Sequence, residues 1–414
     1  MLVNYLIIAY RNLLRHKVFS AITISGLAIS MSAFLLIWQY VYFEKSYDSF
    51  HEQGQYLYRI DRITEKNGEK LNEGNQTALA HGPALKEDLS EVADFCRLHP
   101  AYGETIVSYE NHNYKEHNLY YVDASFLQMF TFPLLKGDKN AVLGEHNSLI
   151  ISESTAKKYF REQDPIGKTL TIHDLGGKHL YMVKGIFADV PANTALTEDV
   201  HDKKNIKFDF LLSNHEITQL NFYRNDPWEW TNFITFVHLH PWADPATVQT
   251  KLNLLGKKYT SKGMAKAGLE VKNFLKPVLQ IHTHAHINLV TGVSTLSETG
   301  KTIVYLSIIA LFILGIGYIN YINLSTARAM ERAKEVGIRK VVGASRMQLI
   351  KQFLLDAILI SAIAFVVAIT TVQLALPYYK RFTGKAIPSI WQYGPEFWGM
   401  LAMVFILGAI LSGV

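Results

Sequence analysis

Cysteine is almost absent from this chain of 414 residues, because Cys96 is the only one. A single cysteine cannot form a disulfide within the chain. A folded domain that contains Cys96 must therefore be stabilised by its hydrophobic core, with no covalent cross-link.

The sequence also lacks the short motifs of nucleotide-binding or catalytic chains. A phosphate-binding loop requires G-x-x-x-x-G-K-[ST]. Five glycines precede a lysine, and none has another glycine five positions earlier: Gly167, Gly177, Gly256, Gly300 and Gly384. Neither H-E-x-x-H nor a nucleophile elbow occurs, and DPWEW at residues 226–230 is interpreted as an aromatic packing corner. The sequence predicts a non-catalytic chain without a cofactor of its own.

Charged residues are missing from four long apolar runs, at residues 18–43, 302–327, 357–379 and 397–414. A helix needs about 20 apolar residues to cross a bilayer. We expect transmembrane helices at 18–43, 301–327 and 352–379, and a fourth at 397–414 that is cut short where the sequence stops. The first run is too long for the apolar part of a signal peptide and has no clean cleavage site at its end.

Basic residues predict the orientation of these helices. Residues 1–17 form an expected interfacial helix with Arg11, Arg15 and Lys17, and the segment 328–351 holds seven basic residues against two acidic ones. The positive-inside rule places both segments, and the N-terminus, in the cytoplasm. The outer loop at 380–396 carries Lys380, Arg381 and Lys385, which weakens this bias without reversing it. The net charge of +5 is therefore explained by topology, with no nucleic-acid partner.

Residues 44–300 lie between the first two predicted crossings and read as a large α+β extracytoplasmic domain. Strands are expected at 56–63, 148–152, 169–173, 181–187 and 233–239, and helices at 82–89, 125–130, 154–160 and 245–257. Asp244 is placed to cap the last helix, with Pro245 at its first position. The predicted fold class is an α-helical membrane protein with about four transmembrane helices and this domain inserted between the first and second.

Two features of the helices bear on packing and transport. Gly26 and Ser30 form a small-xxx-small pair that suits close helix contact, although ordinary membrane composition explains them equally well.

Asp356 is the one charged residue in the spans, and it lies near a predicted cytoplasmic end. The spans therefore lack the buried charges of an ion pathway.

Several stretches resemble the MacB/FtsX-like family of ABC transporter permeases. The strongest is ARAMERAKEVGIRKVVGASRMQLIKQFLLDAILIS at residues 327–361, which is similar to the pattern R-x-R-E-I-G-I-R-K-A-x-G-A of that family. AYRNLLRHKVFSAITISGLAISM resembles the first span, and YYVDASFLQMFTFPLLKGD, SLIISESTAKKYFREQDPIGKTL and YMVKGIFADVPANTAL resemble its periplasmic core domain. Departures include Arg161 where the family has Gly, and KPVLQIHTHAHINL near the end of the domain. The resemblance is to the N-terminal half of the two-repeat, Bacteroidetes-type form.

This resemblance implies a permease subunit in a bacterial inner membrane that couples ATP hydrolysis to movement of its outer domain. ATP and Mg would bind a separate cytoplasmic ABC ATPase, and a second permease copy or a fused second repeat would complete the assembly. Efflux or extraction of peptides, drugs or lipoproteins is the implied activity. The implied ATPase-coupling residues are Arg332, Glu335, Gly337, Arg339, Lys340, Gly343, Ala344 and Ser345. Without the resemblance, a basic loop that only contacts anionic lipid explains the segment as well.

Two alternatives remain open. The chain is a non-transporting signalling or scaffold protein that regulates an extracytoplasmic partner such as a cell-wall hydrolase, or its outer domain is an enzyme. His282, His284 and His286 occupy alternate positions, so on a strand their side chains would share one face and could together bind a metal such as zinc. The segment, however, has no Cys or carboxylate. We therefore expect no metal site, with these histidines as weak candidates.

Overall fold

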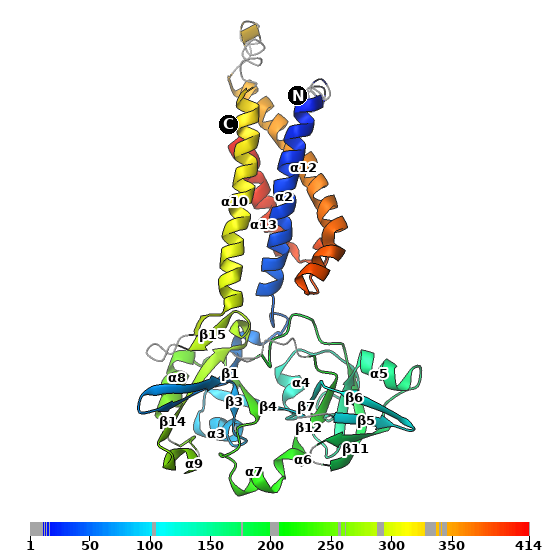
Figure 1. The fold of residues 1–414 in the computed structure, drawn as a ribbon, viewed down its shortest axis with the longest axis vertical. Helices are drawn as coiled ribbons and strands as arrows, with labels where there is room; N and C mark the ends of the chain where they lie inside the picture. Colours follow the sequence, from blue (N-terminus) through cyan, green and yellow to red (C-terminus); the bar gives the residue numbers. More distant parts are fainter. Residues whose placement is uncertain are drawn as a thin grey trace. The chain divides into compact units, whose positions relative to one another are not determined.

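The computed structural model describes residues 11, 13, 15, 17–101, 105–174, 177–198, 207–255, 258–260, 262–287, 294–327, 337–338, 341 and 346–413. The chain forms two compact units (Figure 1). The helical unit comprises Met1–Lys45 and Lys301–Val414, and the inserted domain comprises Ser46–Gly300.

Long apolar helices dominate the helical unit: α2 (Lys17–Lys45), α10 (Glu298–Ala327), α12 (Arg346–Thr383) and α13 (Pro395–Gly413), with the short 3₁₀-helix η3 (Ile390–Gln392). The first three are 29, 30 and 38 residues long, or about 44 to 57 Å at 1.5 Å per residue. Each has an apolar stretch that is long enough to cross a membrane, and that of α13 is shorter. Together with the inserted α+β domain described below, these helices confirm the predicted fold class.

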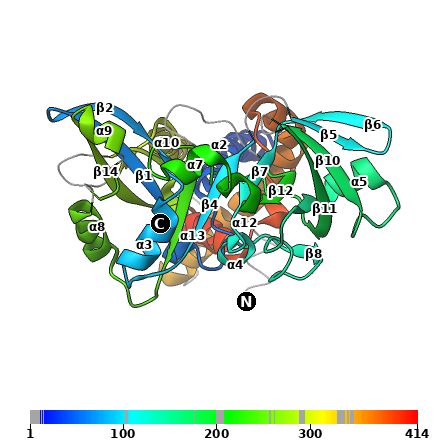
Figure 2. The ribbon, with the colours of Figure 1, turned by 90° about the horizontal axis from the view of Figure 1, so that it is seen from below.

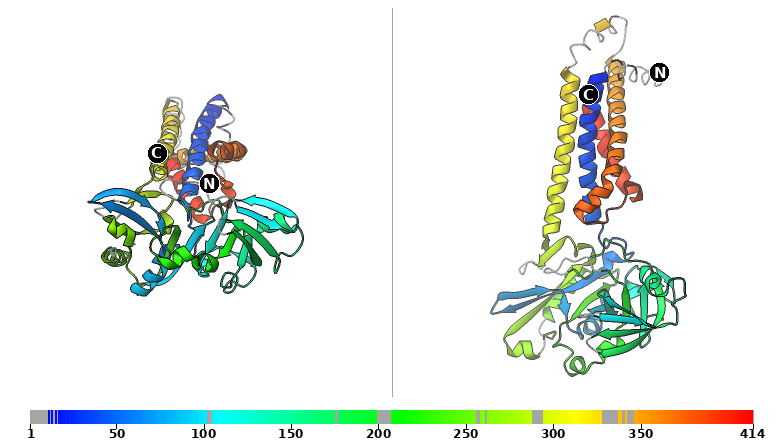
Figure 3. Two further views of the ribbon diagram at one scale, coloured as in Figure 1. Left: turned by 60° about the horizontal axis from the view of Figure 1, so that its bottom comes forward. Right: turned by 45° about the vertical axis from the view of Figure 1, so that its right-hand side comes forward.

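The helix α2 is the centre of the helical unit. In its apolar stretch 44% of the residues are buried, against 28% in α10 and 33% in α12, and the right-hand view of Figure 3 shows α2 running beside α10 and α12. Its side chains Leu27, Met31, Phe34 and Leu35 share one apolar cluster with α10, α12 and α13. The α12 side of this cluster is formed by Ala364, Ala368 and Val372, whose small size allows close approach.

The predicted small-residue pair lies where α2 meets α10. Ser30 packs directly against Gly317, since a Cβ added to Gly317 would lie 2.5 Å from the Ser30 Cβ. A Cβ added to Gly26 would lie 3.4 Å from Asn320 Nδ2. The contact therefore requires glycine at position 317, because any larger residue forces the two helices apart.

Gly317→Ala should lower the midpoint of thermal unfolding of the detergent-solubilised chain by several degrees, because overpacking a tight contact typically costs about 1–3 kcal/mol. The matched control is Gly315→Ala in the same helix, where an added Cβ would meet no atom within 4 Å. Intrinsic fluorescence against temperature measures both. Equal midpoints for the two variants would show that the helices do not meet at Gly317.

The inserted domain is built on one large mixed sheet. Its strands follow the order β14-β1-β13-β4-β7-β12-β9-β11-β10-β5-β6, with β2, β3 and β8 paired to β1, β13 and β11. The strands are β1 (Leu57–Lys66), β2 (Glu69–Gly74), β3 (Gln76–Thr77), β4 (Val92–Pro100), β5 (Thr105–Tyr109), β6 (His112–Glu116), β7 (Leu119–Val122), β8 (Leu134–Lys136), β9 (Ser148–Ser152), β10 (Thr169–Asp174), β11 (Gly177–Phe187), β12 (Phe210–Ser213), β13 (Phe233–Leu239) and β14 (Leu269–Pro277). The pairs β7–β12 and β9–β11 are parallel. The two ends of the sheet lie on opposite sides of the domain (Figure 2).

Short helices and a second, two-stranded sheet complete the domain. The helices are η1 (Gly54–Tyr56), α3 (His81–Asp88), α4 (Phe126–Met129), α5 (Glu153–Phe160), α6 (His215–Thr218), α7 (Asn221–Asn225), α8 (Pro245–Leu254), α9 (Lys262–Lys266) and η2 (Val278–Gln280). The small sheet pairs β15 (His284–Ile287) with β16 (Ser294–Leu296). The predicted cap of α8 is confirmed, because the Asp244 carboxylate accepts from the backbone N–H groups of Ala246 and Thr247.

Two hydrophobic cores hold the sheet. Around α5, Tyr159 and Phe160 pack on β9, β10 and β11. Around α3 and α8, Leu85 and Leu252 pack on β1 and β13. Cys96 is fully buried in β4. Apolar packing stabilises both parts of the sheet, as the lack of disulfides requires.

The first and last long strands of the domain are neighbours. β1 and β14 pair antiparallel over nine residues, from Tyr58 opposite Pro277 to Lys66 opposite Leu269. This pairing brings the segment that enters the domain close to the segment that leaves it.

Candidate functional site

Most of the predicted ATPase-coupling residues lie outside the described residues: Arg332, Glu335, Arg339, Lys340, Gly343, Ala344 and Ser345. Gly337 is described and exposed, and among the described residues no other side chain lies within 4 Å of the position of its missing Cβ. Nearby, Ile338 is 60% exposed and Val341 is 88% exposed. The described part of this segment thus presents apolar side chains that its own chain leaves uncovered.

The last turns of α2 are held by the end of α12 and by the connection between α12 and α13. Tyr379 Oη of α12 donates to the Leu36 carbonyl at 3.1 Å, and Tyr393 Oη donates to the Gln39 carbonyl at 3.3 Å. Both donors reach carbonyls inside the helix, where each oxygen has a second lone pair free to accept. α2 is therefore fixed in position and in rotation at this end.

An ion pair completes this hold. Lys385 Nζ lies 3.1 Å from Glu44 Oε1, and the Glu44 side chain is fully buried within the protein. A buried carboxylate is costly unless it is paired, so Lys385 stabilises the buried charge in the last turn of α2. We call these three contacts, made by Tyr379, Tyr393 and Lys385, the helix clamp.

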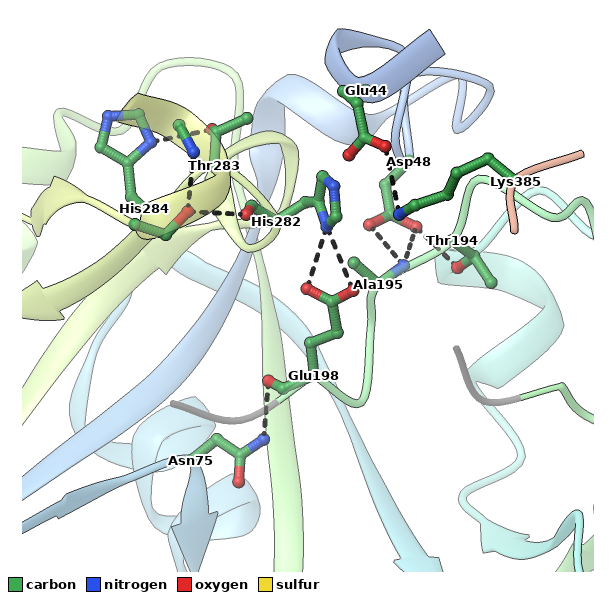
Figure 4. A network of polar contacts seen from close by, with 12 residues as sticks. Glu44, Asp48, Asn75, Thr194, Ala195, Glu198, His282, Thr283, His284 and Lys385 are labelled. Atoms are coloured by element: carbon green, nitrogen blue, oxygen red, sulfur yellow. Dashed lines mark hydrogen bonds and ion pairs between the residues drawn. The ribbon is translucent and has the colours of Figure 1, made fainter. Parts of the chain in front are cut away.

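Directly after α2, the chain enters the domain through the entry connector, Ser46–His51, which is fastened to a loop far along the sequence (Figure 4). Asn193 Nδ2 donates to the Ser46 carbonyl at 2.9 Å, and Asp48 N donates to the Asn193 carbonyl at 2.9 Å. The Asp48 carboxylate accepts from Thr194 Oγ1 at 2.7 Å and from Ala195 N at 3.0 Å. Asp48 itself has φ of 56°, in the left-handed region that Asp tolerates.

The end of the entry connector is bonded to a second loop. Thr131 N donates to His51 Nδ1 at 3.0 Å, and Glu52 N donates to Thr131 Oγ1 at 2.9 Å. The His51 ring packs against Phe130 and Phe132, with ring centroids 5.3 Å apart in both cases. Since Nδ1 accepts a hydrogen bond, the neutral ring carries its proton on Nε2, which faces Asp48 Oδ1 at 3.8 Å.

The exit connector, described over residues 281–287 and 294–300, is bonded to the same region. His282 Nδ1 lies 3.0 Å from Glu198 Oε2, and its ring stacks on Tyr47 of the entry connector with centroids 3.6 Å apart. Ser297 Oγ donates to the His282 carbonyl at 3.1 Å and accepts from Gly300 N at 3.0 Å. Entry, exit and the 193–198 loop thus form one bonded junction within the domain.

Burial sets the ionisation of this junction. Burial raises the pKa of the Asp48 carboxyl to about 7, against the lowering effect of the hydrogen bonds from Thr194 and Ala195. Burial also lowers the pKa of the His51 imidazole to about 4. At neutral pH the junction therefore holds a neutral imidazole beside a carboxyl that is close to its midpoint.

The candidate metal ligands are used in other ways. His282 is bonded to Glu198, and His284 Nδ1 lies 2.9 Å from Thr283 Oγ1. The side chain of His286 lies outside the described residues. Over the described part of the chain, no three His, Cys, Asp or Glu side chains gather as metal ligands would.

The sequence did not single out Asp48, Asn193 or Glu198 as site residues. Asn193–Ala195 does lie inside the stretch YMVKGIFADVPANTAL that carries the family resemblance. That stretch was the available signal, because Asn and Thr side chains in a loop commonly hydrogen-bond to nearby backbone.

Two family models together cover most of the chain. Residues 20–254 match the MacB-like periplasmic core domain, and residues 307–414 match the FtsX-like permease C-terminal. The chain therefore belongs to the MacB/FtsX-type ABC transporter permeases, and it is a multi-pass membrane protein with a periplasmic domain. The resemblance seen in the sequence is confirmed.

Among curated proteins, the chain is 25% identical over 252 residues to the macrolide export ATP-binding/permease protein MacB of Neisseria gonorrhoeae, which covers 60% of this chain and 33% of that protein. It is 29% identical over 126 residues to the probable syringafactin export ATP-binding/permease protein SyfD of Pseudomonas syringae, a match that covers 30% of this chain and 17% of that protein. The chain thus matches only a third or less of the length of these two relatives.

Two solved structures are also similar. A permease protein domain from Porphyromonas gingivalis matches with 24% identity and a TM-score of 0.45, covering 55% of this chain and 91% of that one. The periplasmic region of MacB from Actinobacillus actinomycetemcomitans matches with 12% identity and a TM-score of 0.34, and the match covers 53% of this chain and 89% of that one.

The junction should show two opposing effects of pH on stability. The folded chain keeps the Asp48 proton up to about pH 7, whereas the unfolded chain releases it near pH 4, so stability from this group is lost as the pH rises from 4 to 7. His51 acts in the opposite sense, because the unfolded chain binds a proton below about pH 6.5 and the folded chain only below about 4. Stability from His51 is therefore lost as the pH falls through the same range.

Asp48→Asn removes the first effect and leaves the second. The unfolding free energy of the variant minus that of wild type should increase by roughly 2–4 kcal/mol as the pH rises from 4 to 7, since one pKa unit corresponds to about 1.4 kcal/mol. Thermal unfolding of the full chain at intervals across this range measures the difference, with the surface change Asp138→Asn as control. A difference that does not vary with pH would contradict a buried, proton-holding Asp48.

Proposed function

We propose that this chain is the force-transmitting membrane subunit of an ABC system whose ATPase is a separate cytoplasmic protein. ATP and Mg bind that partner, which contacts the segment around Arg332 to Ser345. The N-terminus lies in the cytoplasm, the membrane is the bacterial inner membrane, and a second permease copy or fused repeat completes the assembly.

The observation that carries this proposal is the firm attachment of α2 on both sides of the Lys45–Ser46 bond. The helix clamp fixes its last turns within the helical unit, and the entry connector is bonded to the domain through Asp48 and Asn193. A helix that is held in this way passes on a displacement, whereas a flexible linker would absorb it. The exit connector leads into α10 through Ser297 and Gly300, so both flanking helices serve as levers.

The cargo class follows from the relatives only by analogy. Their names describe export of macrolides and of syringafactin, and export or extraction of peptides, drugs or lipoproteins is what we propose here. Apart from Asp356 near a predicted cytoplasmic end, the interior of the predicted spans holds no charged residue, which is consistent with a cargo that does not pass through an aqueous channel in this chain.

The proposed contact with the ATPase can be tested by substituting two acidic residues of the segment 328–351, one at a time. Glu335→Gln should reduce stimulation of the cognate ATPase in reconstituted membranes by about tenfold, because a charge-assisted contact contributes roughly 1.5 kcal/mol. Glu331→Gln, which lies outside the matched family pattern, should change the rate less than twofold. Equal behaviour of the two variants would mean that the segment is a basic loop without a defined partner.

The domain side is tested by Asn193→Ala, which removes both hydrogen bonds to Ser46. ATPase stimulation should persist, while the ATP-dependent distance change between spin labels on α8 and α10 should shrink. Cys96 is buried and is the only cysteine, so introduced labelling sites react selectively. Asn253→Ala on the surface of α8 is the control. An unchanged distance response in Asn193→Ala would show that the junction does not carry the movement.

A further inference from the structure

The end of α12 presents an exposed aromatic pair beside two cations. Tyr378 and Phe382 are four residues apart and therefore on one face of the helix, and they are 75% and 89% exposed. Lys380 and Arg381 lie between them in sequence and are exposed as well. This combination, at the end of a membrane-spanning helix, is the chemistry of an interfacial anchor.

The two cations have no counter-charge in the described part of the chain. Lys385 is paired with Glu44 in the helix clamp, but no carboxylate lies within ion-pair distance of Lys380 or Arg381 among the described residues. Glu396, in the first turn of α13, is the acidic residue nearest to them in sequence. This surface therefore keeps a local excess of positive charge.

These cations also lie on the side of the membrane where basic residues are disfavoured. Tyr379 and Lys385 contact the last turns of α2, the end from which the chain enters the periplasmic domain. The positive-inside rule depletes short loops on that side of Lys and Arg. Their presence calls for a local partner of negative charge.

We propose that the end of α12 binds the headgroup of an anionic phospholipid such as phosphatidylglycerol in the outer leaflet. Lys380 and Arg381 contact the phosphate, and the rings of Tyr378 and Phe382 insert at the level of the glycerol and upper acyl chains. Trp391 of η3, 66% exposed, contributes a third interfacial ring. Its segment is tied to α12, because Ser389 Oγ, directly before η3, donates to Gln373 Oε1 at 3.1 Å.

The bound lipid would act on the helix clamp. Tyr379, whose hydroxyl donates to the Leu36 carbonyl, stands between Tyr378 and Lys380 in the same helical turn. Holding this turn in the interface holds the Tyr379 donor in place, so lipid composition tunes how firmly α2 is gripped. This inference goes beyond the coupling proposal and does not require an ATPase.

Native mass spectrometry of the purified full chain tests the proposal, with phosphatidylglycerol and phosphatidylcholine titrated separately. The wild-type chain should prefer phosphatidylglycerol, and Lys380→Gln with Arg381→Gln should weaken that binding by roughly 30-fold, since each basic residue near an anionic surface contributes about a factor of five. The same charge change made on α9, Lys262→Gln with Lys266→Gln, should leave binding unchanged. The charge-preserving Lys380→Arg should also bind as wild type, which separates loss of charge from loss of fold.

Three results would overturn the proposal. Equal binding of the two lipids would remove the role of charge, and undiminished phosphatidylglycerol binding by the double Gln variant would remove the role of Lys380 and Arg381. Displacement of the lipid by millimolar glycerol 3-phosphate would show a site for soluble phosphates and not for a membrane surface.

Discussion

The pairing of β1 with β14 is the constraint on which the rest of the structure depends. A domain inserted between two membrane helices must return its chain to the place where it began. Nine residue pairs between the first and last long strands achieve this, and they bring Tyr47 and His282 close enough to stack. The bonded junction, and with it any mechanical role for α2 and α10, exists only because these strands are neighbours.

The junction is polar where an apolar contact would have been simpler. Asp48 is fully buried, and its oxygens are used by Thr194 and Ala195, so the contact is directional in a way that hydrophobic packing is not. Burying an ionisable group costs stability, and a protein tolerates this cost where geometry matters more than strength. If α2 acts as the lever proposed above, directional bonds at its end would transmit rotation as well as displacement.

Much of the fold was predictable from the sequence because its signals are local. Charge-free runs indicated the membrane helices, although α12 continues from Arg346 to Thr383, beyond the apolar stretch, because a helix does not end where hydrophobicity does. Strands that are short, largely apolar runs rich in β-forming residues, such as β9 and β13, were predicted over the residues where they lie. β4 and β14 were missed because each buries a cation, and the partners of these cations lie on other strands or loops: Arg97 pairs with Asp123, and Lys276 with Asp61. The same holds for the junction, since Asp48 and Thr194 are 146 residues apart and nothing local marks them as partners.

The position of β13 in the sheet has a consequence for how the protein is made. This strand lies between β1 and β4, although it follows both of them in the sequence by more than half the length of the domain. As the chain emerges across the membrane, β1 can pair with β2 and β4 with β7, but the edges of β1 and β4 that face β13 keep unsatisfied hydrogen-bonding groups until β13 arrives. Assembly of the sheet is therefore tied to completion of translocation, and the waiting intermediate is the species that periplasmic chaperones and proteases would meet.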